Sequence, residues 1–374
     1  MSPPLPRPAP HVAALPLSRP FVAPEELARL GGHADLLRLG ANESSFGPPP
    51  AALAAMREAL PYTSWYGDPE STELREALAA LHGCAVDEIV VAAGIDDLLG
   101  LCVRGYLAPG EVAVTTLGSY PTFVYHVSGY GGALETVPYA LDGRVQLDAL
   151  AAAARAAHAK LVYLANPDNP SGSFAGPADV AAFVAALPED ALLVLDEAYV
   201  DFVPSGEVLA GAVHPRIVRT RTFSKAYGMA GARIGYALAA REVIETFGKI
   251  RLQYGVNRTA QVGALAALPE RRFVADVVDE VARGREEYAV TARHAGLSVL
   301  GSHANFVLID AGARERAERL LTALLERGVF VRKPGAAPLD RCIRVTVGTA
   351  AQRARFAAIF GEAVRALEAN PQPA

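Results

Sequence analysis

The sequence contains little cysteine, and no cysteine spacing that would build a scaffold. Its 374 residues include three cysteines, Cys84, Cys102 and Cys342, which lie far apart with no CxxC pair. This excludes a disulfide framework and a thiolate zinc site, and it suits a reducing compartment, so we expect a cytoplasmic protein. The eight histidines are scattered without metal-ligand spacing, and we expect no metal.

Positive charge is not in excess, and long apolar runs are absent. The chain has 35 Lys and Arg against 40 Asp and Glu, a formal net charge of −5, so no basic surplus is available to follow a nucleic-acid backbone. Uninterrupted apolar runs are short; residues 191–195, for example, reach about a quarter of the roughly 20 residues that a membrane-spanning helix needs. We therefore expect neither a nucleic-acid partner nor a membrane segment.

Several common motifs are missing as well. The sequence has no GxGxxG, no GxxxxGK[ST], no HExxH and no GxSxG, which leaves little support for a nucleotide-binding, zinc-protease or α/β-hydrolase function. Prolines interrupt every apolar stretch at the start of the chain, so this start does not resemble a signal peptide. We expect residues 1–35 to form an arm that is partly disordered, or alternatively one that packs on a partner subunit.

Apolar residues are abundant and are arranged as short strands. Hydrophobic residues make up 51% of the chain, enough for a sizeable core. Helical stretches alternate with apolar runs rich in β-branched residues, at 88–93, 112–116, 134–138, 161–165, 191–195, 217–220 and 234–239. Continuous apolar runs are typical of strands covered on both faces, and this alternation predicts an α/β fold with a mostly parallel, seven-stranded sheet.

The pattern changes after residue 242, where long charged helical stretches are followed by short strand candidates. We interpret residues 36–242 as a large α/β domain and residues 243–374 as a smaller α+β domain that includes a connecting helix. Ligands of such sheets bind at the carboxyl ends of the strands. Three successive strand ends carry an amide, a carboxylate and a lysine, namely Asn169, Asp196 and Lys225, and neighbouring strand ends would gather them around one pocket.

The strand-end motifs resemble those of a known family. The motifs NPDNPSG, DEAYVDF, RTFSKAYGMAGARIGY and RVTVGT follow one another in this order. Together they resemble the fold-type-I pyridoxal-phosphate (PLP) aminotransferases and, among them, the histidinol-phosphate aminotransferases, from about residue 39 to residue 365. The resemblance implies a transaminase with PLP as cofactor, small amino and keto substrates, and a homodimer with a shared active site.

The resemblance also implies a role for each matching residue. Lys225 would form the Schiff base with PLP and then move protons, while Asp196 would keep the pyridine nitrogen protonated. Tyr199 and Asn169 would hydrogen-bond the phenolate oxygen. The remaining cofactor contacts would be the backbone amides of Ile95 and Asp96, Ser224 and Arg233 at the phosphate, Tyr66 of the neighbouring subunit at the same phosphate, and the ring of Phe123 stacked on the pyridine.

The residues that would contact the substrate match the family less closely than the cofactor residues do. Arg344 would bind the acidic group of the substrate, with secondary contacts from Asn42, Arg332 and Tyr254. The chain departs from the family at several places. Residues 42–48 read NESSFGP where NENPxGP is common, Phe21 lies near a position where a tyrosine is common, and Asp168 stands where asparagine is common. Ile95 stands where a small residue is usual, and Phe123 where tyrosine is common.

These matches predict transfer of the amino group of histidinol phosphate to 2-oxoglutarate, giving imidazole-acetol phosphate and glutamate, by a ping-pong reaction of histidine biosynthesis. The alternatives are an aromatic amino acid aminotransferase and a PLP decarboxylase of the threonine-phosphate type. A catalytically silent PLP-fold regulator is disfavoured, because the lysine is intact and no room precedes the first strand for a DNA-binding domain.

Overall fold

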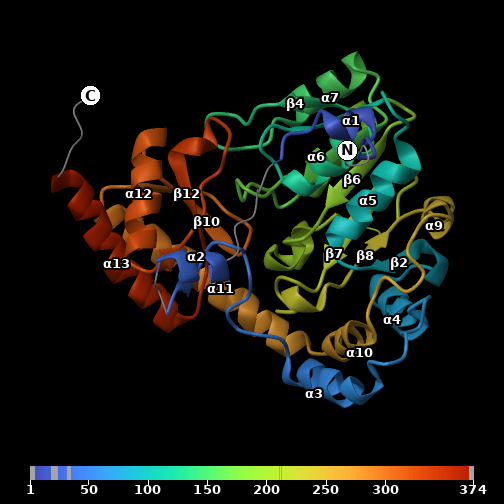
Figure 1. Cartoon of the computed structure of the whole chain (residues 1–374), viewed down its shortest axis with the longest axis horizontal. Helices are drawn as coiled ribbons and strands as arrows, with labels where there is room; N and C mark the ends of the chain where they lie inside the picture. The colour runs from blue at the N-terminus through green and yellow to red at the C-terminus, as the bar shows by residue number, and fades with distance from the viewer. Residues whose placement is uncertain (1–4, 18–23, 32–34, 210, 212, 370–374) are drawn as a thin grey trace.

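The computed structural model describes residues 5–17, 24–31, 35–209, 211 and 213–369 (Figure 1). Its helices are α1 Pro10–Ala13, α2 Pro24–Gly31, α3 Pro50–Ala59, α4 Thr72–His82, α5 Ile95–Tyr106, α6 Pro121–Gly129, α7 Leu147–Ala156, α8 Pro177–Ala186, α9 Arg241–Gly248, α10 Arg258–Ala267, α11 Arg271–His294, α12 Arg314–Glu326 and α13 Ala350–Ala369. Short 3₁₀ helices include η3 Val200–Phe202, η5 Ala230–Ala232 and η6 Leu339–Arg341.

The larger part of the molecule is built on a seven-stranded sheet with the order β2-β8-β7-β6-β5-β3-β4. The strands are β2 Ile89–Ala92, β3 Val112–Thr116, β4 Ala133–Val137, β5 Leu161–Ala165, β6 Leu192–Asp196, β7 Ile217–Thr222 and β8 Gly235–Leu238. Strands β4, β3, β5, β6 and β7 run parallel, whereas β8 pairs antiparallel with both β7 and β2. The predicted mostly parallel sheet is therefore confirmed.

Helices cover both faces of this sheet, which explains the continuous apolar strands. Helices α5, α6 and α9 bury Leu98, Phe123 and Phe247 on one face. Helices α7 and α8 bury Leu150 and Phe183 on the other. Strands β5 and β6 are buried at every position, so neither face of the sheet centre meets water.

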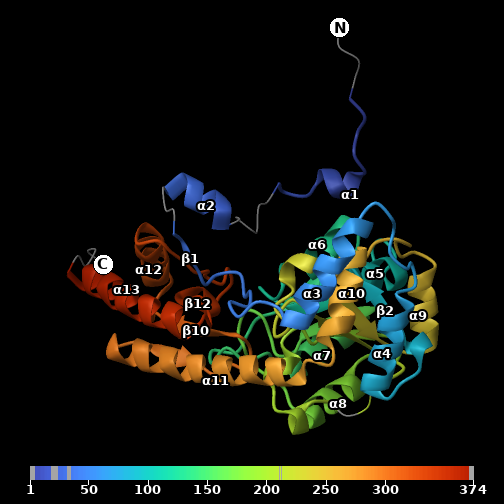
Figure 2. The same cartoon turned by 90° about the horizontal axis from the view of Figure 1, so that it is seen from below.

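The smaller part is an antiparallel three-stranded sheet packed against long helices. Its strands are β9 Ser298–Leu300, β10 Phe306–Asp310 and β12 Cys342–Thr346, in the order β12-β10-β9. Helices α11, α12 and α13 contribute to its core, which centres on Phe306, Phe356 and Phe360. Figure 2 shows α11 running along the molecule from the side of α12 and α13 toward the large sheet.

The two parts are interleaved along the chain. Strand β1 (Leu37–Arg38) pairs with β11 (Val329–Phe330), and its Leu37 belongs to the core of the smaller part. Conversely, α9 and α10 pack into cores of the larger part through residues such as Phe247 and Ala264. We therefore propose that the division lies within α11 rather than at the expected position 242/243, with residues 37–39 added to the smaller domain.

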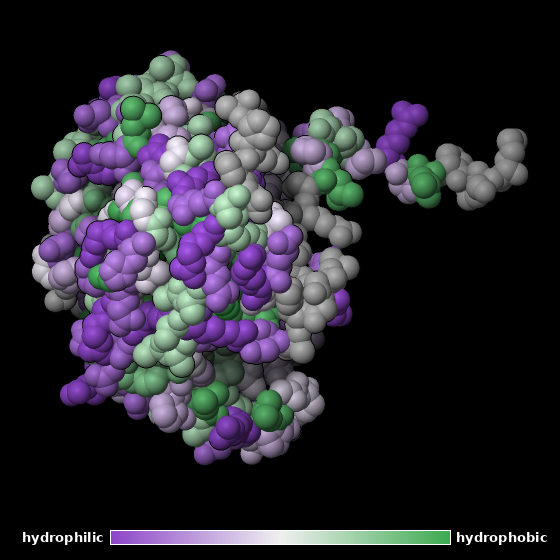
Figure 3. Space-filling model, turned by 90° about the vertical axis from the view of Figure 1, so that its left-hand side faces the viewer, coloured by the Kyte–Doolittle hydropathy of each residue, from purple (hydrophilic) through white to green (hydrophobic). Residues whose placement is uncertain are grey.

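Part of the expected arm, including Phe21, lies outside the described residues. Residues 5–17 are exposed throughout, and the segment before α1 stands away from the body of the molecule (Figures 2 and 3). In the described ranges, none of the helices has the length and hydropathy to cross a membrane. The same ranges contain no group of His, Cys, Asp and Glu that could hold a metal ion.

Candidate active site

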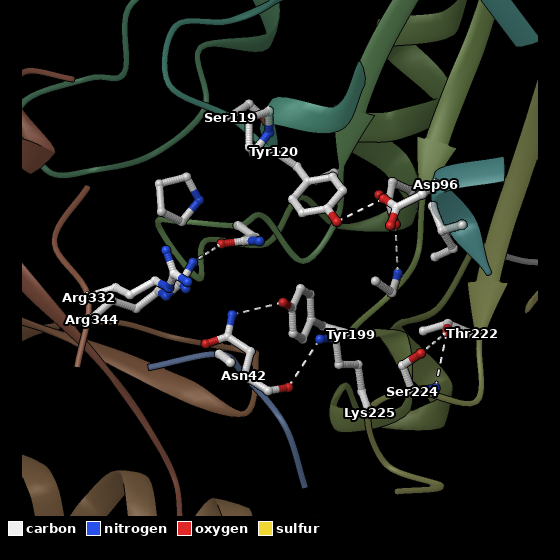
Figure 4. A pocket seen from close by; sticks show the side chains of 18 of the residues that line it. Asn42, Asp96, Ser119, Tyr120, Tyr199, Thr222, Ser224, Lys225, Arg332 and Arg344 are labelled. Atoms are coloured by element: carbon white, nitrogen blue, oxygen red, sulfur yellow. Dashed lines mark hydrogen bonds between the residues drawn. The ribbon is translucent and has the colours of Figure 1, made fainter. Parts of the chain in front are cut away.

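A cavity of about 620 Å³ lies at the carboxyl ends of the parallel strands. The ends of β5, β6 and β7 contribute Ala165, Asp196 and Thr222 to its wall. The opposite wall comes from the smaller part, through Arg332 and Arg344 (Figure 4). The cavity therefore lies where α/β sheets bind ligands, and both parts of the molecule line it.

Lys225 follows β7 and projects into this cavity beside the ring of Tyr199. Its Nζ atom lies 5.5 Å from the centroid of that ring and donates a hydrogen bond of 3.1 Å to the backbone oxygen of Asn42. Desolvation in the cavity, aided by the positive charge of Arg344, lowers the pKa of Lys225 to about 8. A substantial fraction of this amine is therefore neutral near physiological pH, which is the form that attacks a carbonyl carbon.

Asp196 is the last residue of β6 and is 3% exposed. Its Oδ2 accepts a hydrogen bond of 2.7 Å from the hydroxyl of Tyr163, and its Oδ1 accepts one of 3.0 Å from the backbone N–H of Ala198. Burial raises the pKa of Asp196 to about 6, against the lowering effect of these two donors. Such a carboxylate gains most from a cationic partner in the cavity, such as a protonated ring nitrogen.

Two side-chain hydrogen bonds in the cavity join Asn42 to Tyr199 and Asn169 to Arg344. The amide of Asn42 donates to the hydroxyl of Tyr199 at 2.9 Å. The guanidinium of Arg344 bonds to the side-chain oxygen of Asn169 and donates to the backbone oxygen of Gly40 at 3.0 Å. All four predicted residues are thus brought together.

Arg332 lies beside Arg344 on the same wall. The backbone N–H of Arg332 donates to the carbonyl of Arg344 at 3.2 Å, and the N–H of Arg344 donates back at 2.6 Å. Burial lowers the pKa of both guanidinium groups, that of Arg344 to about 10. Two partly desolvated cations on one wall favour an anionic group of a ligand.

The start of α5 provides an anion site at the other end of the cavity. Gly94 precedes the helix with a φ of 89°, and a Cβ atom there would lie 2.7 Å from Nη2 of Arg233. Ile95, Asp96, Ser224 and Arg233 all line the cavity. Free N–H groups at a helix start, a hydroxyl and a guanidinium make a suitable cradle for a phosphate.

Phe123 does not line the cavity, contrary to its expected role as a stacking ring. It is fully buried within α6, and its ring stacks on that of Tyr163 with centroids 4.8 Å apart. The helix begins at Pro121, which turns residue 123 toward the sheet and leaves Tyr120 at the cavity wall. The Tyr120 hydroxyl donates to Oδ1 of Asp96 at 2.8 Å.

Tyr66 and Tyr254 also lie outside the cavity of their own chain. Their rings stack on each other with centroids 4.5 Å apart, and they are 75% and 54% exposed. The sequence predicted that Tyr66 acts on a neighbouring subunit, and its outward position is compatible with that. Tyr254 was expected at the substrate without a partner subunit, and this chain alone does not bring it there.

Sequence reasoning missed several residues that line the cavity, among them Tyr120, Tyr163 and Thr222. Thr222 donates from its hydroxyl to Oγ of Ser224 at 2.8 Å. A signal for Tyr120 exists in the sequence, because this residue follows the apolar run at 112–116 and so lies near the carboxyl end of a predicted strand, where ligands bind. Tyr163 lies inside an apolar strand, where the sequence pattern indicates only core.

The donor set fits one kind of cofactor. It combines a reactive amine, a buried carboxylate, phenol and amide donors from Tyr199 and Asn169, and an anion cradle at the start of α5. A ring nitrogen, a phenolate oxygen, an aldehyde and a phosphate, all on one small molecule, would meet these groups. PLP carries all four.

Comparisons with known proteins agree with this chemistry. A family model described as aminotransferase class I and II matches residues 34–360. The chain belongs to the class I and II aminotransferase family, and it is therefore a transaminase.

Several proteins that are similar to this chain are histidinol-phosphate aminotransferases. It is 36% identical to the histidinol-phosphate aminotransferase of Anaeromyxobacter sp. (strain Fw109-5), over 94% of this chain and 97% of the relative. A histidinol-phosphate aminotransferase of Thiobacillus denitrificans is also 36% identical, over 96% and 93% of the two chains. The crystal structure of the histidinol-phosphate aminotransferase of Sinorhizobium meliloti in complex with PLP has a TM-score of 0.93 at 44% identity, covering 97% of this chain and 99% of that one.

Proposed function

We propose that this transaminase is a PLP-dependent histidinol-phosphate aminotransferase that transfers the amino group of histidinol phosphate to 2-oxoglutarate. The paired guanidinium groups of Arg332 and Arg344 carry this proposal, because they face Lys225 across the cavity and provide an anion site separate from the cradle at α5 (Figure 4). The names of the relatives support the choice of substrate. The cofactor is pyridoxal 5′-phosphate.

The proposal assigns each cofactor contact to a residue that lines the cavity. Ser224, Arg233 and the N–H groups at the start of α5 hold its phosphate, and Asp196 binds its ring nitrogen. Tyr199 and Asn169 donate to its phenolate oxygen. When bound, PLP supplies an electrophilic carbon for the amino group and a ring that withdraws electrons from the substrate.

The protein's own residues then perform the proton transfers. Lys225 has a pKa of about 8, so near neutral pH it can accept a proton from the reacting carbon and return it to a neighbouring atom. Arg344 orients the substrate by its acidic group, and Asn169 fixes one edge of the Arg344 guanidinium. Asn42 fixes the hydroxyl of Tyr199 at 2.9 Å and accepts from Lys225, which keeps both groups turned toward the cavity.

We also propose a homodimer in the cytoplasm, acting in histidine biosynthesis. Tyr62, Trp65, Tyr66, Leu252 and Tyr254 place exposed apolar surface on two loops, and this is the kind of surface that a second copy covers. Tyr66 would then reach the phosphate in the partner's cavity, and Tyr254 the substrate there.

The substrate is tested with purified protein loaded with PLP. Histidinol phosphate, phenylalanine and glutamate are added separately, and the loss of the visible absorbance band of the cofactor is followed in time. We expect histidinol phosphate and glutamate to discharge the band much faster than phenylalanine. A faster reaction with phenylalanine would replace the proposed substrate by an aromatic amino acid, and release of CO₂ would indicate a decarboxylase.

A further inference from the structure

Tyr163 is a buried polar side chain that the reaction described above does not use. It lies in the middle of β5, where it is paired with Val194 of β6. Ala165, two residues further along β5, is paired with Asp196. Alternate residues of a strand share one face of a sheet, so Tyr163 and Asp196 lie on the same face and the long phenol side chain can reach the carboxylate.

The contact between the two side chains is direct. The Tyr163 hydroxyl donates to Oδ2 of Asp196 at 2.7 Å, and the two residues are 1% and 3% exposed. The backbone N–H of Ala198 holds the other carboxylate oxygen at 3.0 Å. Each oxygen thus has one fixed donor from the protein, so the plane of the carboxylate is set and its remaining lone pairs are available to a ligand in the cavity.

The ring of Tyr163 is itself held in place by Phe123. The two rings stack with centroids 4.8 Å apart and planes inclined by 15°, and Phe123 is fully buried. A ring clamped in this way loses little further side-chain entropy when its hydroxyl bonds to Asp196. Phe123, which does not reach the cavity, therefore acts on it through Tyr163.

We propose that Tyr163 is a positioning residue for Asp196, and that its hydroxyl keeps this carboxylate ionised and correctly turned toward the ring nitrogen of the cofactor, with Phe123 locking the Tyr163 ring. The inference rests on the proposed cofactor and adds a residue that none of the sequence motifs indicated.

The groups around Asp196 explain why such a donor is needed. Burial and the negative charge of Asp96 raise the pKa of Asp196, whereas Tyr163, the N–H of Ala198 and Lys225 lower it to a net value of about 6. Tyr163 in turn faces Asp168 and Tyr120 besides Asp196, and burial among these groups keeps its own hydroxyl protonated. Without the Tyr163 donor the pKa of Asp196 rises toward neutrality, and a protonated acid no longer stabilises a positive ring nitrogen.

The substitution Tyr163→Phe tests this role because it keeps the stacked ring and removes only the hydroxyl. We expect the dissociation constant of PLP, measured by absorbance titration of the protein freed of cofactor, to rise about tenfold, as for loss of one charge-assisted hydrogen bond. We expect kcat to fall by a similar factor while KM changes little. The pH midpoint of the visible absorbance should move upward, because a positive ring nitrogen helps to expel the proton of the neighbouring Lys225 nitrogen.

Tyr139→Phe is the matched control, since it removes another buried tyrosine hydroxyl that donates to a carboxylate, Asp168, at 3.0 Å. This variant should leave the absorbance midpoint at the wild-type pH. Phe123→Leu keeps the hydroxyl but loosens the ring, and should shift the midpoint in the same direction as Tyr163→Phe by a smaller amount. If thermal unfolding shows that Tyr163→Phe does not fold, Phe123→Leu serves as the test variant instead.

The outcomes distinguish a failure of the proposed cofactor from a failure of the proposed role of Tyr163. A wild-type protein that shows no visible band with PLP would overturn the proposed cofactor and, with it, the role of Tyr163. A normal wild-type band together with an unchanged midpoint and an unchanged PLP dissociation constant in Tyr163→Phe would overturn only the role of Tyr163. Equal shifts in Tyr163→Phe and Tyr139→Phe would show a general effect of lost buried hydroxyls, and would also overturn it.

Discussion

The two ends of the cavity are built in different ways. At the cofactor end, Asp196 ends β6, and Ser224 and Lys225 follow β7, the adjacent parallel strand of the same sheet. At the substrate end, Arg344 of β12 bonds to the side-chain oxygen of Asn169, which follows β5 and lies 175 residues away along the chain. One end is a local consequence of strand order, and the other is formed only when the smaller part closes against the larger.

This difference separates catalysis from specificity. The cofactor end is rigid, because its side chains are fixed by sheet register and by neighbours such as Tyr163 and Thr222. The substrate end joins two parts of the fold, so the distance from Arg344 to Lys225 depends on how those parts pack. Changes at the first end should affect the chemical step, and changes at the second should affect mainly substrate binding.

The largest expected effect is at the cofactor end. Lys225→Ala removes the only group we assign to proton transfer, so kcat should fall by at least about a thousandfold. The visible absorbance of the PLP-loaded protein should change as well, because the amine no longer reacts with the cofactor. Turnover near the wild-type rate would contradict the assignment of the whole cofactor end.

A substitution at the substrate end should separate KM from kcat. Arg344→Ala removes a buried guanidinium from the anion site, and we expect KM for histidinol phosphate to rise about a hundredfold, with a smaller fall in kcat. Arg355→Ala is the control, because Arg355 forms an exposed ion pair with Asp35 and neither residue lines the cavity. An unchanged KM in Arg344→Ala would transfer the anchoring role to Arg332.

Mixing two impaired variants would show whether each cavity contains residues from both subunits. We expect Tyr66→Ala to weaken PLP binding in the partner's cavity. Lys225→Ala and Tyr66→Ala should then regain part of the activity when their subunits are exchanged, because each mixed dimer contains one cavity with both residues intact. Each variant carried through the exchange by itself is the control, and failure to regain activity would place Tyr66 outside the partner's site.

The smallest of the expected effects is a change in folding stability, at Asp168 beside the cavity. It is 1% exposed, its Oδ2 accepts from Tyr139 and from Ser171, and burial raises its pKa to about 6. Because the ordinary pKa of an aspartate is about 4, the carboxyl favours folding most below about pH 4, and this contribution is lost as the pH rises through about 6.

Asp168→Asn removes this titration. The variant should therefore gain stability relative to the wild type between pH 5 and pH 8, by at most about 3 kcal/mol, as measured by thermal unfolding of the cofactor-free protein. Asp276→Asn on the exposed face of α11 is the control, and it should show no such gain. A stability difference for Asp168→Asn that does not vary with pH would mean that the carboxyl does not ionise in this range.

Much of the fold could be predicted because it depends on local pattern. Strands β3 and β5 coincide with the predicted runs, since continuous apolar, β-branched segments have no other stable place than a sheet covered on both faces. The division between the two parts could not be predicted in the same way. Helix α10 is distant in sequence from α3, and their packing is decided by burial of an apolar face rather than by chain order.

The sequence by itself determined the chemistry of the cofactor end, because polar residues that directly follow buried parallel strands must lie together at one edge of the sheet. Only the tertiary structure decided which aromatic side chain faces the cavity. Tyr120 directly precedes α6 and Phe123 lies in its first turn; the direction of that helix turns Phe123 toward the sheet and leaves Tyr120 at the cavity wall. Likewise, only packing brings Tyr163 to Asp196, because a hydroxyl inside an apolar strand has no sequence signal until its partner on the next strand is known.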